Sequence, residues 1–288
     1  MVFQEPLLFD TTVFENVASG LRIRRITKED ISRIVTQQLD RFGIGHLSRR
    51  SARKISGGEA QRTSLARAFA LQPEVLLLDE PFASLDPPTR ESLIEDLEGI
   101  LRQTQTTTLF ATHDRQEALR LSDRIAVMNN GKILQIGSPE EVMNRPVDEF
   151  VASFVGVETV ITGRVIKKEG GTFVASVSEQ EIEAVGEAQV GEEVVLGIRP
   201  EHVTLAAHSS REVTSARNLF SAIIEKIVSL GLYQKVQLDC GFPLVAYVTH
   251  HSMESLSLGE GKVVIASFKA TAIHVIRRKL STIEHPKT

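Results

Sequence analysis

Two adjacent carboxylates stand directly after a predicted β-strand. Val75–Leu78 is a short apolar run after Pro73, the pattern of a central strand buried on both faces of a sheet. Asp79 and Glu80 would then lie at the carboxyl end of that strand, where open α/β sheets bind ligands. Asp79 could hold Mg²⁺, and Glu80 could act as a general base toward water. The alternative for an isolated Asp-Glu pair is that both side chains are simply solvated.

A glycine pair marks a second candidate site. Ser56, Gly57 and Gly58 open a segment rich in helix formers, Glu59–Ala70. The glycines would let the backbone approach an anion, and the helix amino terminus would direct N–H groups and its positive dipole end at phosphate. An ordinary turn in which Ser56 caps the helix is the alternative, and both descriptions can hold at once.

His113 is a third candidate, because it follows the Thr-rich strand candidate Thr106–Ala111. A single histidine at a strand end is more often structural than catalytic. Its neighbours along the chain therefore decide how it is interpreted.

Taken in order, these motifs resemble those of ATP-binding-cassette (ABC) ATPases, over the first 155 residues. Five segments carry the resemblance: Val2-Phe3-Gln4-Glu5-Pro6 (the Q-loop), Ile55–Glu59 (the signature L-S-G-G-Q, with Ile for Leu and Glu for Gln), Val75–Glu80 (a Walker-B strand), Ala83-Ser84-Leu85-Asp86 (the D-loop) and Thr112-His113-Asp114 (the H-loop).

The resemblance implies ATP and Mg²⁺ as cofactors and assigns roles at the chain's own nucleotide. Asp79, together with Gln4, would hold Mg²⁺, and Gln4 would link that site to a membrane partner. Glu80 would be the catalytic base. His113 would contact the γ-phosphate and orient the water. For Gln4, a loop side chain facing solvent is the alternative.

The resemblance also implies that a complete site needs a dimer of ATPase subunits. Ser56, Gly57, Gly58 and Glu59 would meet the ATP held by the other subunit. Asp86 would communicate across the dimer.

One expected motif is absent from the 288 residues, the phosphate loop G-x-x-x-x-G-K-S/T. The Gly-Lys pairs at Gly131 and Gly261 are followed by Ile133 and Val263, so neither qualifies. We therefore expect this chain alone to be inactive as an ATPase and to expose apolar surface at its sheet edge. Two classes of function remain open. One is a transport ATPase, if the natural protein is longer; the other is a non-catalytic regulatory or oxyanion-binding subunit that pairs with an intact ATPase.

The region between the Q-loop and the signature is predicted to be helical, at Val13–Leu21 and Asp30–Phe42. In the resembled family this subdomain contacts a short helix of the transmembrane permease subunit. The apolar residues of Pro6–Phe9 are the candidates for that contact.

Composition is that of an ordinary globular chain, with 42% hydrophobic and 24% charged residues. Cys240 is the single cysteine, so no internal disulfide can form. The net charge of −4 gives no reason to expect nucleic acid as a partner. No apolar run approaches the ~18 residues of a membrane span, so membrane association would come through a partner.

After about residue 155 the pattern changes to short β-rich runs, which suggest small OB-type barrels. The predicted strands are Gly163–Ile166, Thr172–Val177, Glu193–Ile198, Lys235–Leu238, Leu244–Val248 and Lys262–Phe268. A weak repeat relates the segments that begin at Arg199 and Lys269, an offset of 70 residues, and indicates two tandem modules.

Ile198-Arg199-Pro200-Glu201 is similar to a strand of the TOBE domains that follow importer ATPases. Ser215-Ala216-Arg217-Asn218 and the segment from Ser267 to His274 resemble the molybdate- and tungstate-binding Mop-like version. Ser215, Arg217 and Lys269 could supply a hydroxyl and cations to a tetrahedral oxyanion. Mop-like folds without a working oxyanion site are the alternative. The adjacent His250 and His251 lack companions at metal-ligand spacing.

The predicted fold is therefore α/β. A truncated, P-loop NTPase-like ABC-ATPase domain with a helical subdomain would span residues 1–155, an OB-like TOBE/Mop domain 156–279, and a tail 280–288. The resemblance implies the ATPase subunit of an ABC importer for molybdate or tungstate at the cytoplasmic face of the membrane. Its partners would be a permease, a second ATPase subunit and, indirectly, a substrate-binding protein. Sulfate, polyamine, sugar and iron importers are the alternatives.

Overall fold

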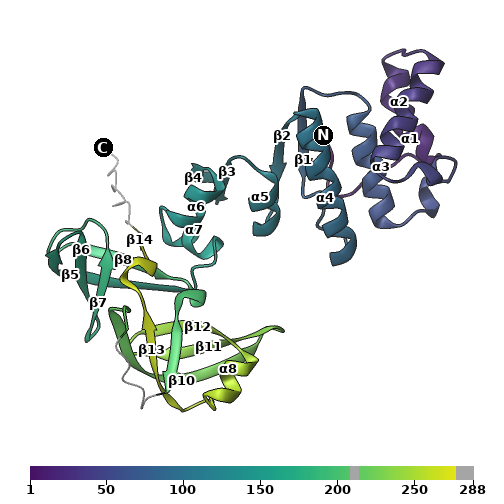
Figure 1. The fold of residues 1–288 in the computed structure, drawn as a ribbon. Helices are drawn as coiled ribbons and strands as arrows, with labels where there is room; N and C mark the ends of the chain where they lie inside the picture. The colour runs from purple at the N-terminus through teal and green to yellow at the C-terminus, as the bar shows by residue number, and fades with distance from the viewer. Residues whose placement is uncertain (208–213, 277–288) are drawn as a thin grey trace, which may run out of the picture. The chain divides into compact units, whose positions relative to one another are not determined.

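The computed structural model describes residues 1–207 and 214–276 (Figure 1). Contacts divide the chain into two compact units, Met1–Ser122 and a second unit that begins at Asp123. The boundary predicted near residue 155 rests on the change to β-rich runs there and stays a prediction, and the predicted tail lies outside the described residues. Among the helices of these ranges, none is both long enough and apolar enough to cross a membrane.

The first unit is mainly helical. Its helices are α1 (Val13–Ile23), α2 (Lys28–Arg41), α3 (Gly57–Phe69), α4 (Pro87–Thr104) and α5 (Arg115–Leu121), with 3-10 turns at Gly45–Leu47 and Ala52–Lys54. Helices α1 and α2 are the two helices predicted between the Q-loop and the signature, and α3 packs on both of them (Figure 1). Thr12 and Thr27 cap α1 and α2, each accepting a hydrogen bond from a backbone N–H of the first turn.

The first unit has two parallel strands, β1 (Val75–Asp79) and β2 (Thr107–Ala111). The loops that carry Glu80 and His113 follow the carboxyl ends of these strands. Val2 runs parallel to β1 on its other side, since its N–H donates to Leu77 O at 2.8 Å and its carbonyl accepts from Asp79 N at 2.9 Å. The segment at Val2, β1 and β2 therefore run in parallel toward the same end of the sheet.

The prediction that β1 is buried on both faces was wrong. Leu76 and Leu78 are buried in the unit's core, but Val75 and Leu77 are 56% and 38% exposed. Leu109, the direct partner of Leu77 on β2, is 68% exposed on the same face. Side chains alternate along a strand, and the helices of this unit cover a single face of the sheet.

The second unit begins with a hairpin and two short helices and continues as antiparallel β-structure. Its elements are β3 (Ile125–Asn129), β4 (Lys132–Gly137), α6 (Pro139–Asn144), α7 (Glu149–Phe154), β5 (Thr159–Glu169), β6 (Thr172–Val177), β7 (Gln180–Val185), β8 (Glu193–Ile198), β9 (Thr204–Ala207), β10 (Asn218–Ser229), β11 (Tyr233–Asp239), β12 (Pro243–Thr249), α8 (His250–Ser255), β13 (Val263–Phe268) and β14 (Ile273–Ile276). All six strand segments predicted for this region lie in these strands, with Lys262 the one residue outside.

The predicted repeat is confirmed, but the two modules are not separate. Strand β8 ends at residue 198 and β13 at residue 268, an offset of 70 residues, and each leads into a 3-10 turn, Pro200–His202 or Ala270–Ala272. The strands after these turns are exchanged between two five-stranded sheets, ordered β14-β8-β5-β6-β7 and β12-β11-β10-β13-β9. Each sheet is therefore completed by a strand that follows the last strand of the other half, β9 after β8 and β14 after β13.

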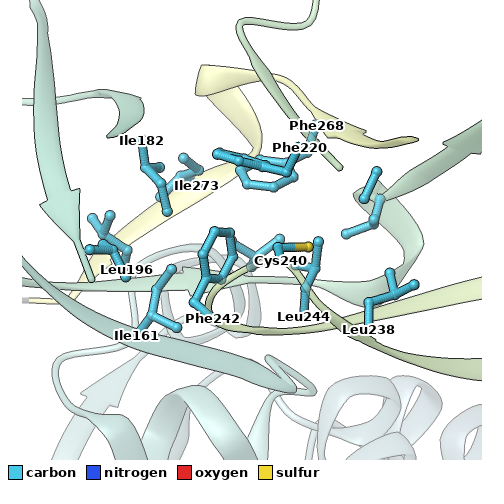
Figure 2. Packing of buried hydrophobic residues seen from close by; sticks show 14 of the residues in the cluster. Ile161, Ile182, Leu196, Phe220, Leu238, Cys240, Phe242, Leu244, Phe268 and Ile273 are labelled. Atoms are coloured by element: carbon cyan, nitrogen blue, oxygen red, sulfur yellow. The ribbon is translucent and has the colours of Figure 1, made fainter. Parts of the chain in front are cut away.

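One hydrophobic core fills both half-barrels (Figure 2). Ile161 and Leu196 of the first sheet share it with Leu238 and Leu244 of the second. The ring of Phe220 lies edge-on to Phe242, with centroids 5.1 Å apart, and tilted against Phe268 at 5.7 Å. Aromatic pairs at such separations add stabilisation beyond their buried area.

Candidate functional site

The structure brings the predicted base and histidine into contact. His113 Nδ1 lies 3.1 Å from Glu80 Oε1, within the first unit. Glu80 is the residue after β1, and its N–H donates to Ala111 O of β2 at 2.9 Å. Its φ of 43° is unusual for a side-chain-bearing residue, which marks a constrained turn at the strand end.

The other predicted residues of this nucleotide site lie at the same edge of the sheet. Asp79 ends β1 and is exposed. Gln4 is exposed two residues after Val2, whose backbone is paired with β1. Gln4 is thus brought near Asp79 and Glu80 by the pairing of two segments that are widely separated along the chain.

The glycine pair opens α3, as predicted, with Ser56 as its N-cap. Ser56 Oγ accepts from Glu59 N at 3.3 Å, and the Glu59 carboxylate accepts from Ser56 N at 2.7 Å, a complete capping box. That backbone hydrogen bond is the main cause holding the pKa of Glu59 below its usual value. The cap is real, and it leaves the anion-binding prediction open.

The two glycines have different surroundings. A Cβ on Gly57 would meet no atom within 4 Å. A Cβ on Gly58 would overlap Thr89 Cγ2, so Gly58 is required by the close approach of α3 to α4. Open space at Gly57 suits the approach of a ligand, whereas Gly58 has a structural reason of its own.

Asp86 is the N-cap of α4, accepting from Thr89 N at 3.2 Å. The hydrogen bonds from Thr89, side chain first, lower the pKa of the exposed Asp86 carboxyl. Because Thr89 also touches the position of Gly58, the D-loop and the signature are neighbours in this unit.

Sequence reasoning missed a charged network beside His113. Arg90 of α4 forms ion pairs with Asp114 and Glu117, which flank the start of α5. Glu117 is 4% exposed in its side chain, and Thr112 donates to it at 2.5 Å. The sequence held one signal for this network. Glu117 is the third residue after the helix cap Asp114, a position at which a carboxylate lies in the first turn of the helix.

The predicted oxyanion residues Ser215, Arg217 and Lys269 are all exposed. The last pair of the β10–β13 ladder is Asn218 with Phe268, so Arg217 and Lys269 stand opposite each other one residue beyond it. Ser215 lies two residues before Arg217. The Asn218 amide is used structurally, donating to Glu183 O and accepting from Glu183 N, each at 2.9 Å.

A groove of about 420 Å³ lies beside the Q-loop in the first unit. Leu7 and Phe9 line it and are 57% and 59% exposed, and Ile23 of α1 is 82% exposed on its rim. Arg67 closes one side with its guanidinium 5.7 Å from the Phe9 ring centroid and donates to Leu7 O at 3.0 Å.

Comparison with known proteins places these features in a family. The ABC transporter profile matches residues 1–83, and the TOBE domain profile matches residues 214–275. The molybdate/tungstate import ATP-binding protein WtpC of Pyrococcus horikoshii is 40% identical over 269 residues, which is 92% of this chain and 74% of that protein. The chain belongs to the ABC importer ATP-binding proteins.

Other ABC importer proteins are similar at nearly the same identity. The trehalose/maltose import ATP-binding protein MalK of Thermococcus litoralis is 36% identical, covering 96% of this chain and 75% of its own. The sulfate/thiosulfate import ATP-binding protein CysA of Mycolicibacterium paratuberculosis is 35% identical, covering 98% and 71%. Family membership implies ATP binding, a permease and a second ATPase subunit, with the TOBE region as two half-barrels.

Proposed function

We propose that this chain contributes to ATP hydrolysis in an importer, with Glu80 as general base and His113 as its partner. The observation that carries the proposal is the contact between His113 Nδ1 and Glu80 Oε1. With Nδ1 donating to the carboxylate, Nε2 is left for a second contact, and the side chain is 74% exposed to receive one. A carboxylate held by such a donor at a strand end can accept a proton from water.

Asp79 and Gln4 are the residues that would hold Mg²⁺. Both residues are exposed near the end of β1 that leads into Glu80, and their side chains carry the oxygen donors that Mg²⁺ prefers. When bound, Mg²⁺ neutralises charge on the phosphate oxygens. The donor set present fits that ion.

Ser56, Gly57 and Gly58 would serve the nucleotide of a second subunit. The open space over Gly57 and the capped amino terminus of α3 support this assignment. Asp86 is held near them through Thr89, which fits communication across a dimer.

The groove beside the Q-loop is our proposed contact with the permease. Leu7, Phe9 and Ile23 expose apolar surface, and Arg24 and Arg67 add cations at its margin. A short amphipathic helix with an acidic end would fit that chemistry.

Molybdate or tungstate is the proposed substrate, because relatives named for it reach 40% identity and the second unit resembles a Mop-like domain. Arg217 and Lys269 would supply the cations of an oxyanion site. The sugar and sulfate relatives lie within five percentage points of 40%, so these substrates, with polyamine and iron, are the alternatives.

The test is hydrolysis and uptake by the natural protein, purified from its own cells with its permease and reconstituted in vesicles. The intact mass of the purified protein, compared with the 31.8 kDa of these 288 residues, shows whether the assayed polypeptide is longer than this sequence. Glu80→Gln should abolish hydrolysis, whereas Glu74→Gln, at the opposite end of β1, should leave it unchanged. Faster uptake of tungstate than of sulfate or maltose would support molybdate or tungstate as the substrate.

Two outcomes would contradict the proposal. Unimpaired turnover by Glu80→Gln would remove the assigned base. Absence of hydrolysis by the assembled wild-type protein would favour the non-catalytic, oxyanion-binding subunit instead, which tungstate binding to the chain would then test.

A further inference from the structure

Arg90 is the centre of a charged network that joins α4 to the loop of His113. Its guanidinium pairs with Asp114 and lies 2.7 Å from the Glu117 carboxylate. The Glu117 side chain is 4% exposed, so Arg90 is the cation that compensates a nearly dehydrated charge. Removing such a cation leaves a buried charge uncompensated.

The two carboxylates hold both neighbours of His113. Thr112 Oγ1 donates to Glu117 Oε2 at 2.5 Å and accepts from Asp114 N at 3.0 Å. Asp114 Oδ1 in turn accepts from Glu117 N at 3.1 Å, which caps α5. His113 therefore lies between two residues, Thr112 and Asp114, that hydrogen bonds and an ion pair hold in place, while its own side chain is 74% exposed. Its orientation toward Glu80 therefore depends on the backbone on either side.

The surroundings of Arg90 and Asp114 favour the charged form of each side chain. Burial lowers the pKa of Arg90, but hydrogen bonding to Asp114 and the charge of Glu117 outweigh it and raise the pKa. Burial raises the pKa of Asp114, but hydrogen bonds from Glu117 N–H and from Arg90 outweigh it and lower the pKa. The network is thus an ion-paired one, whose strength depends on the planar guanidinium meeting two carboxylates.

We propose that Arg90 is a positioning residue for His113. Through Asp114 and Glu117 it fixes the turn that presents the imidazole to Glu80. This inference rests on the proposed function of the Glu80–His113 pair. Arg90 lies four residues after Asp86 in the first turn of α4, so it also connects the D-loop segment to His113.

Arg120 provides a matched control within the same two helices. It joins α5 to α4 through Glu91 and, at 2.9 Å, Glu98. Its side chain is 34% exposed against 31% for Arg90. Loss of Arg120 removes helix–helix ion pairs without touching either neighbour of His113.

The experiment compares Arg90→Gln, Arg90→Lys, Arg120→Gln, His113→Ala and the Arg90→Gln/His113→Ala double variant in the reconstituted importer. Arg90→Gln should lower kcat about 10- to 100-fold, with a smaller change in KM for ATP, because it displaces a catalytic group. Arg90→Lys should recover part of this loss, and Arg120→Gln should stay near wild type. The double variant should be no slower than His113→Ala, since Arg90 acts through His113.

A second readout does not depend on turnover. In ¹H–¹³C NMR spectra of the chain, the His113 imidazole signals, assigned with His113→Ala, should move in Arg90→Gln and stay in place in Arg120→Gln. Unmoved signals, a kcat no lower than that of Arg120→Gln, or multiplied losses in the double variant would each overturn the inference. Should the wild-type assembly not hydrolyse ATP, the proposed function fails and the NMR comparison still decides the positioning role.

Discussion

Gly57 and Gly58 should respond in opposite ways to the same substitution. Both open α3, but a Cβ on Gly58 would overlap Thr89 Cγ2, whereas one on Gly57 would meet no atom within 4 Å. Gly58→Ala should therefore strain the contact between α3 and α4. Gly57→Ala should leave the folded first unit undisturbed.

The size of the effect follows from what can move. Thr89 is β-branched, and its N–H is held by Asp86 at 3.2 Å, so the clashing methyl has few places to go. Overpacking of a buried contact costs about 1–3 kcal/mol. The better helix propensity of alanine offsets up to about 1 kcal/mol. We expect Gly58→Ala to lower the free energy of unfolding by about 1–2 kcal/mol, and Gly57→Ala to leave it equal or slightly higher.

Urea unfolding of the full chain can follow each unit by its own signal. The long helices lie in the first unit and dominate far-ultraviolet circular dichroism. The two tyrosines, Tyr233 and Tyr247, are both in the second unit, and the chain has no tryptophan. Gly58→Ala should lower the urea midpoint seen by circular dichroism and leave the midpoint seen by tyrosine fluorescence unchanged.

Thr89→Ser supplies the decisive partner variant, because serine keeps the hydroxyl and lacks Cγ2. Gly58→Ala combined with Thr89→Ser should regain most of the lost stability relative to Thr89→Ser alone. Equal midpoints for Gly57→Ala and Gly58→Ala, or no recovery in the double variant, would refute the reasoning. If Gly57 faces a nucleotide, Gly57→Ala should keep its stability and lose ATP hydrolysis in the importer.

Two further predictions concern the second unit. Asn218→Ala should cost about 1–3 kcal/mol in urea unfolding followed by tyrosine fluorescence, since Glu183 N–H and C=O lose their partner; an unchanged midpoint would contradict this. Burial, and then the charge of Arg199, lower the pKa of His274 below 6.5, and its Nδ1 lies 3.0 Å from Asn144 O. The stabilising contribution of His274 is therefore complete above pH 6.5 and is lost as the pH falls through the lowered pKa. Between about pH 7.5 and about pH 5, the wild-type protein should lose more stability than His274→Asn. Equal losses in the two proteins would exclude His274 as the cause.

Helices and strands were largely predictable because their signals are local. The β-runs from Thr172 to Phe268 carry alternating or apolar patterns bounded by glycines, and the strand limits agree within a few residues. Capping residues such as Ser56 and Asp86 are also local, since each accepts from a backbone N–H in the first turn of its own helix. The edge position of Asp79 and Glu80 followed from one rule about parallel sheets.

Exposure and long-range pairing were not predictable in the same way. Val75–Leu78 is apolar at every position, so no alternation shows which face the helices leave open. Arg90 stands among the charged residues of α4, and its partners lie 24 and 27 positions further along. Which arginine in such a run meets a buried carboxylate depends on how helices pack, and that is set by tertiary contacts.

The exchanged strands also decide when the second unit can become complete during synthesis. Strand β8 pairs on one side with β5, but its other neighbour, β14, is the last described strand, with Ile198 opposite Ile273. The ribosome therefore releases β8 with an unpaired edge and makes the whole second half-barrel before that edge is covered. Pairing between strands so far apart along the chain slows folding. The edge of β8 therefore stays unpaired until β14 has been synthesised and can cover it.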